Sequence, residues 1–171
     1  MTGAYVGPPP PRSFARLWVS SVLLAVYTAF VLVVTMWPAP EQLEFDGIAT
    51  RVLRMLHNVG VPEWFGYDKL EFTANVGMFV PLGFLLGLAL PRKGWWLAVF
   101  LLPAFSAGIE ATQGLALENR VSTILDVLAN TTGGYIGLLV AMILRAMIHA
   151  RDRTMIEREL WERRVATAEP R

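Results

Sequence analysis

The sequence predicts an all-α integral membrane protein: a four-transmembrane-helix bundle with an extracytoplasmic amphipathic helix between spans 1 and 2. Three observations predict this fold class. Of the 171 residues, 54% are apolar and only 17% are charged, and the mean hydropathy is +0.46, whereas soluble domains carry about 25% charged residues. Four stretches are long and apolar enough to cross a bilayer. Basic residues also cluster at three places that such a bundle would put on one side.

The four expected spans contain almost no charge, and only Glu110 and Asp126 interrupt them. A helix rises about 1.5 Å per residue, so about 20 residues cross the 30 Å of bilayer hydrocarbon. Each stretch reaches that length. The spans are residues 17–37, 72–90, 94–114 and 124–144.

Basic residues set the expected orientation of these spans. They lie before the first span, in the turn between the second and third, and after the fourth: Arg12, Arg16, Arg92, Lys93, Arg145, Arg151, Arg153 and Arg158. By the positive-inside bias this side is the cytoplasm. We therefore expect a multi-pass protein of the cell membrane with both termini cytoplasmic. Residues 1–16 are expected to be a disordered N-terminus, residues 17–148 the transmembrane domain, and residues 149–171 a charged cytoplasmic helix or tail.

The longer outer segment, residues 38–71, carries a helical pattern. Ile48, Val52, Met55 and Val59 recur at spacings that place them on one face of a helix. A helix with such a face, outside the spans, is typical of segments that lie in the plane of the membrane surface. We expect this one to lie on the outer surface.

Polar residues inside the predicted membrane are the candidate site. They fall in the outer half of the bundle or the outer loop: Asn75, Ser106, Glu110, Gln113, Arg120, Asp126 and Asn130. Ser106, Glu110 and Gln113 are spaced i, i+4 and i+7, so one helix face carries all three. A carboxylate in hydrocarbon costs about 2.5–3.5 kcal/mol on insertion scales, so Glu110 should face the bundle interior and have a partner. Arg120 is the obvious partner.

A purely structural interpretation accounts for the same residues. Glu110 and Arg120 could form an ion pair that only holds the bundle together, and Thr123 and Asp126 could form a capping box at the start of the fourth span. Polar contacts between membrane helices are ordinary and are worth about 0.6 kcal/mol each. Against this interpretation, ionisable groups are rare in membranes and usually serve a function.

The composition also limits the chemistry. The chain has no cysteine, and its two histidines are His57 and His149, which argues against disulfides, thiol nucleophiles and a Cys/His zinc cluster. We expect no metal and no cofactor. The net charge of +1 provides no electrostatic case for binding nucleic acid. Membrane lipids are the expected partners, and association of copies into a homo-oligomer is left open.

An ordered set of motifs resembles the VanZ-like family, which is named after a protein associated with teicoplanin resistance. The motifs are Asn75-Val-Gly-Met-Phe-Val-Pro81-Leu-Gly83, Ser106-x3-Glu110-x2-Gln113, Arg120, Asp126-x3-Asn130 and Gly133-x3-Gly137. In the last motif, small residues let the fourth span approach a neighbour closely. The resemblance covers about residues 17–144. It implies a small integral membrane protein with an association with glycopeptide resistance, and it implies no catalytic mechanism that transfers.

Two classes of function fit these observations. In the first, the outer-leaflet polar residues bind or modulate a lipid headgroup or a lipid-linked cell-envelope precursor, with Arg120 pairing to a phosphate or carboxylate. In the second, the chain is a membrane-embedded enzyme in which Glu110 or Asp126 acts as acid or base on a lipid-linked substrate. Binding is favoured because no nucleophile motif or metal cluster supports catalysis. A small transporter is a third, weaker alternative, since the polar residues stop halfway across the membrane.

Overall fold

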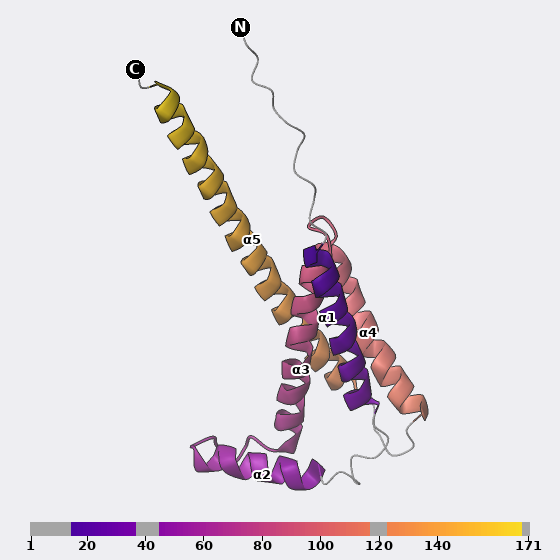
Figure 1. The fold of residues 1–171 in the computed structure, drawn as a ribbon. Coiled ribbons are helices and arrows are strands. Elements are labelled where there is room, and N and C mark those ends of the chain that lie inside the picture. Colours follow the sequence, from indigo (N-terminus) through magenta and orange to yellow (C-terminus); the bar gives the residue numbers. More distant parts are fainter. Residues whose placement is uncertain (1–14, 37–44, 117–122, 169–171) are drawn as a thin grey trace.

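The computed structural model describes residues 15–36, 45–116 and 123–168, and within these ranges every regular element is a helix. The helices are α1 (Ala15–Thr35), α2 (Phe45–Asn58), α3 (Tyr67–Ala89), α4 (Trp95–Ala116) and α5 (Ile124–Ala168). By length and composition α1, α3, α4 and α5 can cross a membrane. They run alongside one another, and α2 lies across one end of the bundle (Figure 1). The predicted all-α membrane class with four spans is confirmed.

The second span begins earlier than predicted. Helix α3 starts at Tyr67, five residues before the expected start at residue 72. Asp68 lies in its first turn, where a negative charge interacts favourably with the partial positive charge of a helix N-terminus. The earlier start places Glu71 on the helix, one turn before Asn75, so the two residues lie on the same helix face.

Helix α2 presents an unpartnered apolar stripe. Ile48, Val52 and Met55 are exposed, as is Val59 just after the helix. A stripe of this kind, next to four spanning helices, fits an interfacial helix that rests on the bilayer. Of the expected N-terminal segment, residues 1–16, residues 1–14 lie outside the described residues, as do residues 37–44, whereas Ala15 and Arg16 belong to α1.

The closest helix pair is α3 and α5, and glycines make their approach possible. A Cβ atom on Gly137 would lie 1.9 Å from the carbonyl oxygen of Val80, and one on Gly133 would lie 2.1 Å from that of Val76. No side chain fits at such distances, so the two backbones touch directly, as the small-residue motif predicts.

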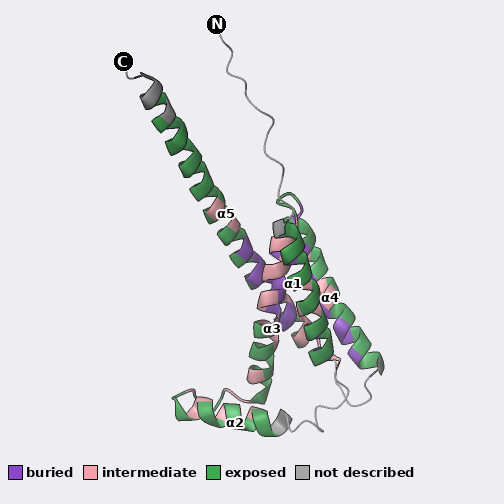
Figure 2. Ribbon diagram, viewed as in Figure 1, coloured by how far each residue is buried: buried purple, intermediate pink, exposed green. Residues whose placement is uncertain are grey.

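The other two spans flank this central pair. Helix α1 packs against α3, and α4 packs mainly against α5. The buried apolar side chains include Val31, Phe79, Leu102 and Leu138, one from each spanning helix. Figure 2 shows that the buried residues gather where the helices meet, whereas the part of α5 that projects from the bundle is exposed. Many large apolar side chains face outward, which is the expected surface of a lipid-embedded bundle.

Arg145, near the middle of α5, connects this helix to the C-terminal end of α3. Its guanidinium donates hydrogen bonds to the carbonyl oxygens of Gly87 and Leu90, at 2.6 and 2.8 Å. These carbonyls belong to the last turn of α3, where no backbone donor is available within the helix. Helix α5 then continues without a break through the predicted domain boundary at residues 148–149, over 45 residues in total.

The α3–α5 contact makes a first prediction. Gly137→Ala should destabilise the bundle, because the new Cβ would collide with the backbone of Val80 rather than with a side chain that can move. Overpacking of this kind costs about 1–3 kcal/mol. Gly77→Ala on α3 is the matched control, since a Cβ there meets nothing within 4 Å. Thermal unfolding in detergent measures both; equal stability of the two variants would contradict the close contact.

The orientation makes a second prediction. The chain contains no cysteine, so a single introduced cysteine reports one position. A cysteine replacing the exposed Glu63, between α2 and α3, should react with a membrane-impermeant maleimide in intact cells, whereas one replacing the exposed Lys93, between α3 and α4, should not. The opposite labelling pattern would reverse the predicted topology.

Candidate functional site

A small polar cavity lies at the end of the bundle where α1 and α4 end and α3 and α5 begin. Its volume is about 60 Å³. All four spanning helices contribute to the wall, which consists of Thr35, Glu71, Asn75, Ile109, Glu110, Gln113, Asp126 and Asn130. The predicted topology puts this end on the extracytoplasmic side.

Asp126 connects α3 to α5 at the rim of this cavity. The Asn75 Nδ2 donates to Asp126 Oδ1 at 3.0 Å, and the Thr123 hydroxyl donates to Asp126 Oδ2 at 2.6 Å. The backbone N–H of Asp126 in turn donates to the Thr123 hydroxyl oxygen at 3.3 Å. The predicted cap at the start of the fourth span is therefore present. Both carboxylate oxygens of Asp126 are engaged in holding the wall together.

Gln113 connects α4 to α1. Its Nε2 donates to the carbonyl oxygen of Thr35 at 2.7 Å. Thr35 is the last residue of α1, and such terminal carbonyls have no partner in their own helix. This hydrogen bond joins the two flanking helices at the level of the cavity.

Glu110 and Asn130 are buried polar residues of the cavity wall. Glu110 is 7% exposed and Asn130 is 2% exposed, so Glu110 faces the bundle interior. The side-chain oxygen of Asn130 has no hydrogen-bond partner among the described residues. A buried acceptor without a donor costs about 1–3 kcal/mol. A donor from a ligand or a water molecule would remove that cost.

The other two residues of the predicted set differ in their placement. Ser106 is fully buried one turn further into the membrane than Glu110 and does not line the cavity. Its hydroxyl also lacks a partner within the described part of the chain. Arg120, the predicted partner of Glu110, lies outside the described residues.

Sequence reasoning missed three residues of the wall, the apolar Ile109 and the polar Thr35 and Glu71. Glu71 is four residues before Asn75 and so lies on the same helix face. This spacing could have identified Glu71, but the span was expected to start only at residue 72, which left Glu71 outside it. Thr35 is an ordinary polar residue at the end of a span, and no sequence pattern distinguishes it.

Size and charge limit what the cavity can hold. A water molecule needs about 10–15 Å³ of such volume, so this cavity holds a few waters or one small polar group. Three carboxylates and the free Asn130 oxygen line it, and these groups accept hydrogen bonds. The cavity therefore suits hydroxyl or ammonium donors. In the ranges that the structure describes, no group of three or more acidic or histidine side chains is arranged to hold a metal ion.

Comparison with known proteins identifies the family. The VanZ/LLP1 family model matches residues 23–145, which is more than two thirds of the chain and includes every residue of the cavity wall. No curated protein and no solved structure matches the chain. Because the family match spans most of the transmembrane bundle, the chain is a VanZ-type membrane protein and belongs to the VanZ/LLP1 family.

Proposed function

We propose that this protein binds a membrane lipid or a lipid-linked cell-envelope precursor by taking one polar group of its headgroup into the polar cavity, and that it modulates envelope components in this way. The observation that carries the proposal is the convergence of polar side chains from all four spans on one cavity inside an otherwise apolar bundle. Ionisable groups in such a position usually serve a function. A link to glycopeptide resistance of the teicoplanin type belongs to this proposal.

The depth of the cavity supports a headgroup as the ligand. Trp64 and Tyr67 are exposed next to the N-terminus of α3, and aromatic residues in membrane proteins concentrate at the headgroup level. Glu71 and Asn75 follow Tyr67 by one and two turns, which is about 6 and 12 Å along the helix. The cavity is therefore within reach of a headgroup and well short of the bilayer midplane.

The cavity wall suggests how such a headgroup is recognised. Glu110 and the Asn130 oxygen accept hydrogen bonds from hydroxyl or ammonium groups of the ligand. Arg120, which follows α4 in the sequence, is assigned to its phosphate or carboxylate, since arginine binds such groups with two parallel hydrogen bonds. This division of roles fits a headgroup that carries both a negative charge and donor groups.

Two observations favour binding over the alternatives. Both carboxylate oxygens of Asp126 already accept hydrogen bonds from Asn75 and Thr123, and this structural role weakens the case for Asp126 as an acid or base. The two other described cavities are lined almost entirely by apolar side chains, whereas a transport path needs polar groups across both leaflets.

A third prediction tests headgroup binding directly. Glu110→Gln keeps the shape of the side chain and removes its charge, so the protein should insert and fold but lose co-purified lipid by about tenfold, because a hydrogen bond to a charged group is worth about 1.5–3 kcal/mol. Native mass spectrometry of the gently extracted protein measures the lipid. Glu63→Gln, at an exposed carboxylate near the same end, should change nothing. Undiminished lipid in Glu110→Gln would count against the site.

A fourth prediction separates ligand binding from a structural ion pair. If Glu110 and Arg120 serve only each other, replacing both by Gln should restore stability and function, because replacing a whole buried pair can be nearly neutral. We expect the double variant to be stable, yet to lack bound lipid or to alter susceptibility to envelope-directed drugs. Thermal stability and lipid content are compared across the wild type, both single variants and the double variant. Full function in the double variant would withdraw both residues from the site.

A further inference from the structure

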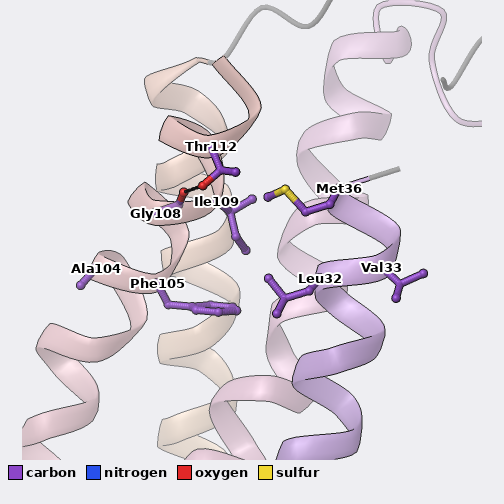
Figure 3. A pocket seen from close by; sticks show the side chains of 8 residues that line it. All are labelled: Leu32, Val33, Met36, Ala104, Phe105, Gly108, Ile109 and Thr112. Carbon is purple, nitrogen blue, oxygen red and sulfur yellow. Dashed lines mark hydrogen bonds between the residues drawn. The ribbon is translucent and has the colours of Figure 1, made fainter. Parts of the chain in front are cut away.

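An apolar groove separates α1 from α4 and opens toward the bilayer. Its volume is about 680 Å³, within the range of about 300–1,000 Å³ that is usual for ligand pockets. Leu32, Val33 and Met36 of α1 line one side, and Ala104, Phe105, Gly108, Ile109 and Thr112 of α4 line the other. Figure 3 shows Met36 and Ile109 pointing toward each other across the space, with Val33 and Ala104 at its outer edges. Val33 and Ala104 are exposed, so the groove is accessible from the membrane.

The groove is chemically suited to hydrocarbon. Thr112 is its one polar lining side chain, and the Thr112 hydroxyl already donates to the Gly108 carbonyl at 2.7 Å. Gly108 leaves the wall open, because a Cβ there would meet nothing within 4 Å. The lining therefore offers dispersion contacts and no unsatisfied hydrogen-bonding side chain.

The groove adjoins the polar cavity at one end and a second apolar cavity at the other. Ile109 lines both the groove and the polar cavity. Phe105 lines both the groove and the second cavity, which has about 190 Å³ and reaches Leu24 and Leu101. From Gln113 to Leu101, α4 rises about 18 Å, close to the ~15 Å of hydrocarbon in one leaflet.

We propose that this groove binds one acyl chain of a membrane lipid whose headgroup places one polar group in the polar cavity. This inference rests on the proposed function and specifies its ligand as an amphiphile that reaches the site laterally, from within the outer leaflet. The groove and the second apolar cavity together cover the length of α4 that a chain would follow from the headgroup level toward the bilayer midplane. A helix of a second copy fits less well, because it would cross the full ~30 Å, whereas the Gln113–Thr35 hydrogen bond joins α1 to α4 at the cavity end of the groove.

Photocrosslinking in lipid nanodiscs tests the proposal. The full chain is placed in nanodiscs of phosphatidylethanolamine and phosphatidylglycerol that contain a phosphatidylethanolamine with a diazirine in the middle of one acyl chain. We expect labelling to concentrate on groove residues such as Leu32 and Phe105, rather than on the exposed lipid-facing Val26 and Phe100. Gly108→Leu should fill the groove and lower the groove labelling by about tenfold. Gly77→Leu, at an open position of α3, should leave it unchanged.

The variants distinguish failure of the groove from failure of the headgroup site. Labelling spread evenly over all lipid-facing residues, or unchanged labelling in Gly108→Leu, would overturn the groove proposal, even if Glu110→Gln still loses co-purified lipid. Groove labelling that falls in Gly108→Leu but persists in Glu110→Gln would support chain binding by the groove and overturn its coupling to the headgroup site. A fall in both variants supports the complete proposal. If Gly108→Leu is less thermally stable than Gly77→Leu, Gly108→Val replaces it and is judged by the same labelling criterion.

Discussion

The direct backbone contact between α3 and α5 is the constraint on which the rest of the structure depends. At Gly133 and Gly137 no atom larger than hydrogen fits between the two helices, so these helices form the centre of the bundle. Inside lipid no hydrophobic driving force holds helices together. The van der Waals contacts made at such a close approach stabilise the helix pair instead. The close approach also brings the start of α5 next to the start of α3, so that Asn75 and Asp126 meet at 3.0 Å.

The same constraint shapes the space on the other side of the bundle. Because α3 and α5 occupy the centre, α1 packs against α3 while α4 packs mainly against α5, and the two flanking helices diverge enough to leave a groove. Their connection at one end is the hydrogen bond from Gln113 to the Thr35 carbonyl. The polar cavity, whose wall includes this hydrogen bond, and the apolar groove thus follow one another along α4. This order matches the order of headgroup and acyl chain in a membrane lipid.

Polar groups within a bilayer must find partners inside the protein, because no water is available there. Most of the cavity wall obeys this rule: Asp126, Asn75 and Gln113 all form hydrogen bonds between helices or at a helix cap. The oxygen of Asn130 is a deeply buried exception among the described residues of the wall. A buried oxygen of this kind can accept a hydrogen bond from a water molecule or a ligand, and Asn130 lines the same cavity as Glu110.

The sequence by itself determined the features that are local along the chain. Hydropathy determined the four spans, helical spacing placed Glu110 and Gln113 on one face, and the three-residue spacing of Thr123 and Asp126 determined the cap. Only the tertiary structure decided that Glu71 and Thr35 join the cavity, that Ser106 does not line it, and that a groove separates α1 from α4. The physical reason is that periodicity specifies which residues share a face of one helix, whereas the neighbour that this face meets depends on the distance and rotation between helices, which are set here by backbone contact at the glycines.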